Sequence, residues 1–357
     1  MQAQAGDSTR FLHACWYVAA WDHELPPGQA LPVEILGEPI VLYRGASGIA
    51  HALADRCAHR HAPLSLGRVE GDSLRCRYHG VRFESDGRCV EVPGTDRIPP
   101  GCRVRTYPLA VCDGWIWIWM GSPGSADPSL IPTGFGVDAS SGAFRTGWID
   151  YQADYRLIND NLCDLSHLDY LHETTLGAAT GGGWSETRPR ISALERGIRV
   201  ERWRAARPMN VSSGAPVDVW NGYSFLAPGI FLMDTRMFPA GEASRSESTA
   251  PAGVPILRWL DQQAVTPMSA TRARYFFATG APDCPAAIEL LDRRFTVLQA
   301  AFAEDRMMIE GQQHVAERGG ERQPQVFLPQ DRAPMLMRNA LDRLIALEAA
   351  DGHHATG

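Results

Sequence analysis

Two short motifs near the amino-terminal end of the chain each combine one cysteine with one histidine. The first is Cys57-Ala58-His59, and the second, sixteen residues later, is Cys76-Arg77-Tyr78-His79. Two thiolates and two imidazoles are the ligands of a Rieske [2Fe–2S] cluster, in which the cysteines hold one iron and the histidines hold the other. Because neutral imidazole replaces anionic thiolate on one iron, the reduction potential of such a cluster lies above that of an all-thiolate ferredoxin. The two motifs therefore predict a bound one-electron carrier.

A structural zinc ion is the alternative interpretation, because two cysteines and two histidines also satisfy tetrahedral zinc. Zinc fingers usually place like ligands together, with two cysteines in one pair and two histidines in the other. Here each motif contains one residue of each kind, which suits a cluster whose two irons take different ligands. Turn-forming residues follow both motifs, His61-Ala62-Pro63-Leu64-Ser65 after the first and Gly80 after the second. The pattern favours the cluster over zinc.

The residues from Cys57 to Ser65 and from Cys76 to Gly80 together resemble the Rieske domain of the Rieske non-haem iron oxygenases. This resemblance implies a second, mononuclear Fe(II) site downstream. Such a site typically uses two histidines and one carboxylate and leaves other positions open for O₂ chemistry. The segment 159–172 is similar to the family signature Asn-x-x-Asp-x-x-His-x₄-His, at Asn161, Asp164, His167 and His172.

His167 and His172 are the two candidate histidine ligands of the mononuclear iron. Five residues of regular α-helix rotate by about 140°, so an undistorted helix cannot turn both side chains to one metal. We therefore expect a π-bulge or a helix end between them, which is a common device at functional sites. An amphipathic helix that carries surface histidines and aspartates is the alternative interpretation of this segment.

The carboxylate ligand is predicted from helical periodicity. Apolar residues recur every three or four positions and form one face of a long helix; they are Ile288, Leu291, Phe295, Leu298, Phe302 and Ile309. Asp305 fills the one gap in this face, whereas Glu304 and Glu310 rotate off it, so Glu304 is expected to be dispensable for turnover. A buried carboxylate needs a counter-charge, and a metal ion is the strongest available. Asp305 is therefore the predicted ligand, and an ion pair with Arg306 is the alternative.

The length of 357 residues allows two domains with full cores. We expect an all-β Rieske domain at 11–122 and an α+β catalytic domain at 123–350. The resemblance implies that the second domain has a helix-grip fold with an antiparallel sheet. The tails at 1–10 and 351–357 are expected to be disordered.

Composition excludes several classes of function. The net charge of −7 argues against nucleic acid or an anionic membrane as the partner. All 34 basic residues are arginine, which excludes Schiff-base lysine chemistry and a P-loop lysine. The sequence shows no run of eighteen apolar residues and no secretory signal, so we expect a cytoplasmic protein without a transmembrane helix. The six cysteines outside the two motifs show no paired framework, so we expect free thiols.

The chain has one predicted one-electron carrier and one predicted O₂ site, but no ferredoxin-type cysteine run and no convincing dinucleotide fingerprint. A separate reductase, with or without a ferredoxin, is therefore implied. The resemblance further implies a homotrimer in which the cluster of one subunit serves the iron of the next. Asp164 is expected to bridge the two centres, and Asn161 to lie beside the iron ligands.

The resemblance covers nearly the whole chain and is to oxygenases of the vanillate and dicamba monooxygenase type. It implies oxidative O- or N-demethylation of a small aromatic or heterocyclic substrate with release of formaldehyde. Aromatic ring hydroxylation uses the same iron ligands and remains an alternative, as does a Rieske electron-transfer protein without oxygenase activity. His61 stands where ring-hydroxylating dioxygenases usually carry glycine. This difference argues weakly against membership of the dioxygenase branch. Candidate substrate contacts are Phe231, Met233 and Trp259.

Overall fold

The computed structural model describes residues 11–208, 215–245, 250–251, 253–283, 287–318 and 325–352. The chain forms two compact units. The first contains residues 1–133, 266–270 and 345–357, and the second contains residues 134–265 and 271–344. Of the tails expected to be disordered, residues 1–10 and 353–357 lie outside the described residues, and residues 351–352 form a turn.

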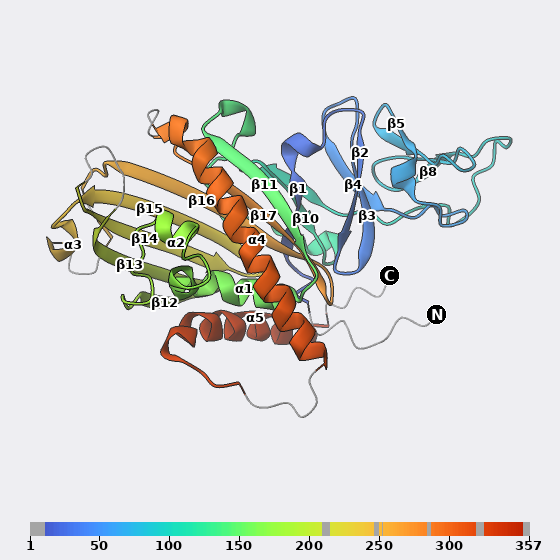
Figure 1. Ribbon diagram of the computed structural model, residues 1–357. Coiled ribbons are helices and arrows are strands. Elements are labelled where there is room, and N and C mark those ends of the chain that lie inside the picture. The colour runs from blue at the N-terminus through green and yellow to red at the C-terminus, as the bar shows by residue number, and fades with distance from the viewer. Residues whose placement is uncertain are drawn as a thin grey trace. The chain divides into compact units, whose positions relative to one another are not determined.

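The first unit is built from three antiparallel sheets, with strand orders β1-β10-β9, β2-β3-β4 and β5-β6-β7-β8 (Figure 1). The strands are β1 Trp16–Trp21, β2 Ala30–Ile35, β3 Glu38–Arg44, β4 Ala50–Ala54, β5 Arg68–Glu70, β6 Ser73–Arg75, β7 Arg82–Phe83, β8 Cys89–Glu91, β9 Leu109–Cys112 and β10 Trp115–Trp119. Every residue of β10 is buried, because its alternating Trp and Ile side chains pack on both faces of the strand. The prediction of an all-β amino-terminal domain is confirmed.

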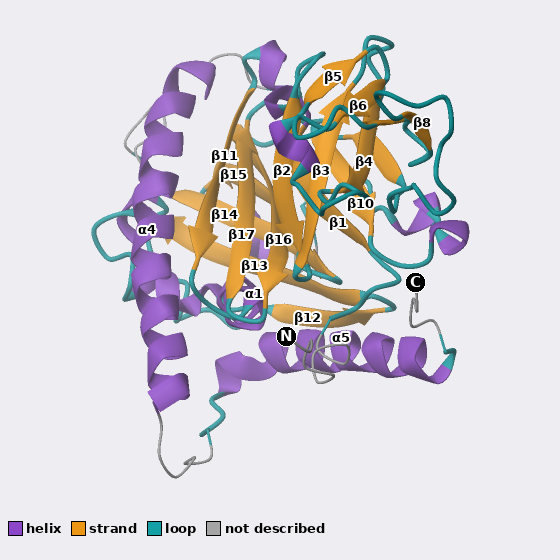
Figure 2. Cartoon of the chain, turned by 90° about the vertical axis from the view of Figure 1, so that its right-hand side faces the viewer, coloured by secondary structure: helices purple, strands orange, loops and turns teal. Residues whose placement is uncertain are grey.

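The second unit contains a seven-stranded sheet of order β11-β17-β16-β15-β14-β13-β12. The pairs whose register is described are antiparallel, which confirms the α+β prediction. The strands are β11 Phe144–Tyr151, β12 Arg190–Leu194, β13 Gly197–Arg207, β14 Val217–Leu226, β15 Ile230–Pro239, β16 Leu257–Ser269 and β17 Arg272–Gly280. The helices are α1 Tyr155–Cys163, α2 Leu176–Ala179, α3 Glu242–Arg245, α4 Ile288–Arg318 and α5 Arg332–Ala350. Figures 1 and 2 show the long helix α4 lying across one face of this sheet.

The apolar face of α4 packs largely as its periodicity predicts. Leu291, Leu298, Phe302 and Ile309 are buried, whereas Ile288, at the first position of the helix, is exposed. Asp305 lies in this buried face with only 4% of its surface exposed. A carboxylate at such a position is costly unless a cation or hydrogen bonds compensate its charge.

Helix α5 is joined to α1 by an ion pair between Arg338 and Asp160. Burial raises the pKa of the Asp160 carboxyl, and the hydrogen bond from Arg338 opposes that rise. The cap at the start of α1 is Asp154, whose side chain accepts a hydrogen bond from the N–H of Arg156. Asp160 therefore fixes a helix contact and not a helix start.

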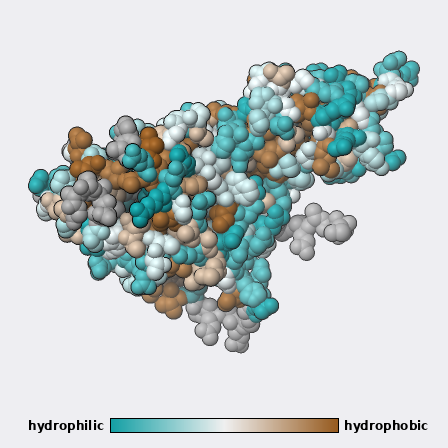
Figure 3. All heavy atoms as spheres, turned by 45° about the horizontal axis from the view of Figure 1, so that its top comes forward, coloured by the Kyte–Doolittle hydropathy of each residue, from teal (hydrophilic) through white to brown (hydrophobic). Residues whose placement is uncertain are grey.

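Hydrophilic and hydrophobic residues are interspersed on the face of the molecule that Figure 3 shows. Among the described helices, none is both long enough and apolar enough to cross a membrane. The cysteines of the described residues are free thiols, and Cys284 lies outside that part of the chain.

Candidate functional site

The two Cys–His motifs form two loops that share one backbone hydrogen-bond pattern. In the first loop, Cys57 donates its N–H to the carbonyl of Ala62 (2.9 Å) and accepts a hydrogen bond from His61 (2.9 Å). In the second loop, Cys76 donates to the residue five positions later (2.8 Å) and accepts from Gly80 (3.0 Å). Each cysteine is thus held at the start of a tight turn.

The four side chains of these loops come together with the thiols inside and the imidazoles outside. Cys57 and Cys76 are buried, whereas His59 and His79 are exposed, with ring centroids 4.6 Å apart. Burial raises the pKa of the Cys57 thiol to about 11, so a thiolate here needs a bound cation. Partial loss of hydration, together with the positive charges of the nearby His59 and Arg60, lowers the pKa of the exposed His79 and favours the neutral imidazole that binds metal. The donor set fits a [2Fe–2S] cluster with exposed histidine ligands.

His61 takes a backbone conformation that usually belongs to glycine. Its φ angle is +55°, and the equivalent residue of the second loop, Gly80, has φ +76°. An L-residue in this left-handed region costs about 1 kcal/mol or more unless its surroundings hold it there. Arg56 contacts the His61 ring at 3.0 Å. The turn geometry explains why glycine suits this position, and a histidine here adds a side chain next to the cluster loop.

A break in helical structure separates the two histidines of the predicted iron site. Helix α1 ends at Cys163, and a 3₁₀ helix, Leu165–Asp169, carries His167. His172 lies in the turns that follow this 3₁₀ helix. The expected helix end is confirmed, and no π-bulge is needed among these residues. Asp164 makes the break, because its carboxylate accepts hydrogen bonds from the N–H and the hydroxyl of Ser166, both at 2.9 Å.

The predicted ligands His167, His172 and Asp305 converge on one point. One ligand atom from each residue lies within 4.8 Å of the others. The Asp305 Oδ1 is 3.5 Å from His167 Nε2 and 3.2 Å from His172 Nε2. Within the described part of the chain, Asp305 has these histidines as its ion-pair partners, and Arg306 is exposed. The geometry matches two histidines and one carboxylate on one side of a metal and does not support the arginine alternative.

Both histidines are oriented by a hydrogen bond on the other ring nitrogen. The Nδ1 of His167 lies 2.5 Å from the carbonyl oxygen of Asp164. The Nδ1 of His172 lies 2.7 Å from the Oε2 of Glu304, which also accepts a hydrogen bond from the Thr175 hydroxyl at 2.7 Å. These contacts leave both Nε2 atoms facing Asp305. Glu304 lies off the buried face of α4 as predicted, but it contacts a candidate ligand, because the turn that carries His172 packs against that side of the helix.

Asn161 and the local charges complete the centre. The Asn161 amide donates to Asp305 Oδ1 (2.8 Å) and lies 3.4 Å from His167 Nε2. Burial lowers the pKa of His167, which keeps its imidazole in the neutral form. Burial also opposes protonation of His172, but hydrogen bonds to Asp305 and Glu304 outweigh it and raise the His172 pKa. A divalent metal at His172 Nε2 would neutralise Asp305, while Glu304 accepts the hydrogen bond from His172 Nδ1.

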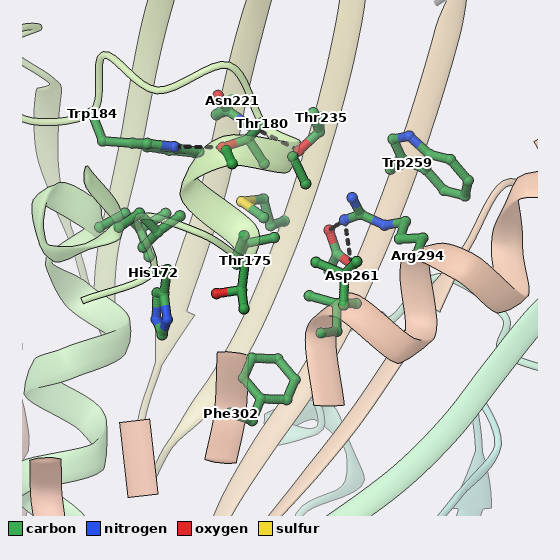
Figure 4. A pocket seen from close by; sticks show the side chains of 18 of the residues that line it. His172, Thr175, Thr180, Trp184, Asn221, Thr235, Trp259, Asp261, Arg294 and Phe302 are labelled. Atoms are coloured by element: carbon green, nitrogen blue, oxygen red, sulfur yellow. Dashed lines mark hydrogen bonds and ion pairs between the residues drawn. The ribbon is translucent and has the colours of Figure 1, made fainter. Parts of the chain in front are cut away.

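A cavity of about 520 Å³ adjoins the three ligands, between α4 and the sheet (Figure 4). Its walls come from strands β13 to β16, from α4 and from the segment around α2. The candidate residues Phe231, Met233 and Trp259 all lie in the wall, and their contact with a substrate stays a prediction. Volumes of this order are typical of sites for small organic ligands.

One cavity cation is neutralised by a carboxylate inside the protein. Arg294 of α4 donates to both carboxylate oxygens of Asp261 at 2.9 Å, and its guanidinium lies over the Trp259 ring at 4.8 Å (Figure 4). Asp261 is 1% exposed. The sequence does not reveal this pair, because its members lie on separate elements and neither belongs to a motif.

Replacing Arg294 with methionine is expected to lower the free energy of unfolding by about 3–5 kcal/mol, because it leaves the Asp261 carboxylate buried without a partner. Urea denaturation of the purified protein measures this change. Arg293→Met is the matched control, because Arg293 is exposed, and its expected effect is within about 0.5 kcal/mol. Equal destabilisation by the two substitutions would contradict the proposed contribution of the Arg294–Asp261 ion pair to stability.

Two family models match the chain. The Rieske [2Fe–2S] domain matches residues 15–108, and the vanillate O-demethylase oxygenase C-terminal domain matches residues 151–347. The chain is 35% identical over 344 residues to the toluene-4-sulfonate monooxygenase system iron–sulfur subunit of Comamonas testosteroni, covering 95% of this chain and 98% of the relative. It is 32% identical to the dicamba O-demethylase oxygenase component of Stenotrophomonas maltophilia, covering 95% of this chain and 99% of that protein.

Solved structures agree with these sequence relationships. A crystal structure of dicamba monooxygenase bound to dicamba superimposes with a TM-score of 0.79 at 29% identity, covering 95% of this chain and 99% of the other. A further structure of dicamba monooxygenase, described as containing non-haem iron and dicamba, gives a TM-score of 0.73.

Proposed function

Because this chain belongs to the Rieske non-haem iron oxygenases of the vanillate O-demethylase type, we propose that it hydroxylates a methyl carbon of a small aromatic or heterocyclic substrate. It is an oxidoreductase, the terminal oxygenase component of its system, with a Rieske [2Fe–2S] cluster and a mononuclear Fe(II) as cofactors. The observation that carries the proposal is the position of His167, His172 and Asp305 at the wall of the cavity.

Each residue of the centre has a distinct part in this proposal. Bound iron supplies O₂ activation, and the three ligand residues leave its remaining positions open for that chemistry. Asp164 and Glu304 hold the two imidazoles by their Nδ1 atoms. Asn161 donates to Asp305 and keeps that carboxylate turned toward the histidines. The apolar wall excludes water and holds the methyl group near the centre.

Demethylation is the reaction that we favour. Hydroxylation of an O- or N-methyl carbon gives a hemiacetal or hemiaminal that collapses to formaldehyde and the free hydroxyl or amine. One O₂, two electrons and two protons are consumed, and the second oxygen atom leaves as water. The named activities of the dicamba and vanillate relatives support this choice. Hydroxylation of a ring-bound methyl group follows the same first step, and the toluene-4-sulfonate relative makes it the second candidate.

Formaldehyde release tests the proposed reaction. Purified protein, reconstituted with iron and supplied with electrons by a reductase, is offered methoxy- and N-methyl-aromatic compounds. A turned-over substrate gives stoichiometric formaldehyde and the demethylated product. Oxygen in the aromatic ring with the methyl group intact would indicate ring hydroxylation, and a hydroxymethyl product without formaldehyde would indicate the second candidate.

Electron supply requires further components. The two electrons for each turnover come from a separate reductase, with or without a ferredoxin. We propose a homotrimer in which the cluster of one subunit reduces the iron of its neighbour through Asp164. The position of Asp164 supports this role, because its backbone carbonyl contacts the ligand His167 while its side chain is only partly buried.

Asp164→Asn is therefore expected to keep both metal centres and to slow turnover by about a hundredfold or more. Asparagine retains an oxygen that can cap Ser166, so the break after α1 survives the substitution. Stopped-flow absorption of the reduced cluster, mixed with O₂ and substrate, measures the electron-transfer step. Ser166→Ala is the control for losing only the hydroxyl hydrogen bond to Asp164. Cluster reoxidation at the normal rate in Asp164→Asn would rule out the bridging role.

A further inference from the structure

Arg204 is a buried cation on the wall of the cavity. It lies on β13, and 1% of its surface is exposed. Its Nη1 donates to the carbonyls of Thr180 (2.8 Å) and Gly182 (2.7 Å), and its Nε and Nη2 both lie 3.3 Å from the Oδ1 of Asn221. All three acceptors are neutral. Among the described residues, no carboxylate forms an ion pair with this guanidinium.

The other charges of the cavity do not compensate Arg204. The Arg294 guanidinium and the Asp261 carboxylate neutralise each other, and the Asp305 carboxylate faces the metal ligands. A second buried arginine, Arg202, donates to the carbonyl of Trp184 and increases the positive charge beside Arg204. Burial and the nearby arginines lower the pKa of Arg204 to about 9, and the charge of Asp169, which forms no described ion pair with Arg204, only partly opposes them. A bound anion would compensate the buried cation.

Hydrogen-bond donors remain available at this end of the cavity. The Asn221 amide donates to the Thr235 hydroxyl oxygen at 2.9 Å, so the hydroxyl hydrogen is free for another acceptor. Arg204 has five N–H groups, and the contacts above account for four, which leaves one on Nη2. Figure 4 shows Thr180, Asn221 and Thr235 together along one side of the cavity, away from the Arg294–Asp261 pair. The site thus offers a cation and unused donors but no negative charge.

We propose that Arg204, Asn221 and Thr235 form the subsite for an anionic group, a carboxylate or a sulfonate, on the aromatic substrate. This inference rests on the proposed function and adds its substrate class. The anionic group fixes the ring by charge-assisted hydrogen bonds, and the apolar wall of Phe231 and Met233 receives the rest of the molecule. A neutral analogue leaves the guanidinium uncompensated and binds more weakly.

Matched ligands test the subsite in the unaltered holoenzyme. Isothermal titration calorimetry compares 4-methoxybenzoate, 4-methoxybenzenesulfonate and the neutral isostere 4-methoxybenzamide. Both anions are expected to bind about tenfold to a hundredfold more tightly than the amide, the range of a charge-assisted hydrogen bond. The ratio of the two anion affinities distinguishes a carboxylate site from a sulfonate site. Equal affinity for all three ligands overturns the proposal.

Substitutions then test whether the preference for anionic ligands depends on Arg204 and Thr235. Arg204→Gln is expected to reduce the anion-to-amide affinity ratio to about one, whereas Arg190→Gln, at an exposed arginine of β12, keeps it. Because Arg204 also supports the backbone near Thr180, Thr235→Val serves as a second variant that retains side-chain shape. It is expected to reduce the same ratio severalfold, and an unchanged ratio in Thr235→Val and in a folded Arg204→Gln contradicts the assignment. Thermal unfolding followed by circular dichroism reports folding in every variant.

The binding data and the turnover data separate the two proposals. Preferential anion binding without formaldehyde from any methoxy or N-methyl probe leaves the subsite intact and overturns the demethylase proposal. Formaldehyde release from the amide and the benzoate with equal affinities supports the demethylase proposal and overturns the subsite.

Discussion

Alanine in place of Cys57 or His79 is expected to abolish the visible absorption and the low-average-g EPR signal of the reduced Rieske centre. Each substitution removes one of the four protein ligands, and these ligands provide the attachment of the cluster to the protein. Cys57 is buried at the base of its loop, so no water-exposed donor can replace its thiolate. The expected loss is complete for Cys57→Ala and includes about two iron atoms per chain.

Cys112→Ala is the matched control for cluster loss, because this thiol lies on β9 of the same unit and outside both loops. Its spectrum is expected to be unchanged. A Rieske signal that survives in Cys57→Ala or in His79→Ala would show that the ligand assignment is wrong.

The identity of the site residues was predictable wherever local spacing carries the chemistry. Two mixed Cys–His pairs indicated the cluster, and one aspartate in an apolar helix face indicated the carboxylate that lies beside His167 and His172. The backbone of His61 was not predictable in the same way, because a positive φ at a histidine leaves no mark on residue spacing. In the structure, His61 donates to the Cys57 carbonyl as Gly80 donates to that of Cys76, and both residues have a positive φ.

Contacts between distant segments account for what the sequence missed. The helical pattern correctly placed Glu304 off the apolar face of α4, but it could not show that the turn of His172 and Thr175 covers that side. In the same way, the sequence did not indicate whether the charged residues of β13 and β16 have ion-pair partners. One of them, Asp261, has a partner 33 residues later on α4, whereas Arg204 has none among the described carboxylates. A paired and an unpaired charge look alike in a sequence.

Replacing Asp305 with alanine is expected to remove the mononuclear iron and stop product formation, while the Rieske spectrum stays intact. Iron should fall from about three to about two atoms per chain, because the remaining two histidines bind ferrous iron weakly. Asp292→Ala is the matched control, since it removes the same side chain from an exposed position of α4. Colorimetric iron analysis and product formation are measured on the same preparations. Loss of iron in the control, or its retention in Asp305→Ala, would contradict the ligand assignment.

Glu304→Gln separates the ligand from the residue that positions another ligand. The amide oxygen can still accept a hydrogen bond from His172 Nδ1, but the negative charge that strengthens this bond is lost. We therefore expect a loss of about tenfold to a hundredfold in iron affinity or activity, with recovery at high ferrous iron. Asp305→Ala is not expected to recover under the same conditions, because its metal-binding atom is absent. Iron titration of both variants distinguishes the two roles: identical, unrecoverable loss would make Glu304 a ligand and would overturn the geometry assigned to this side of α4.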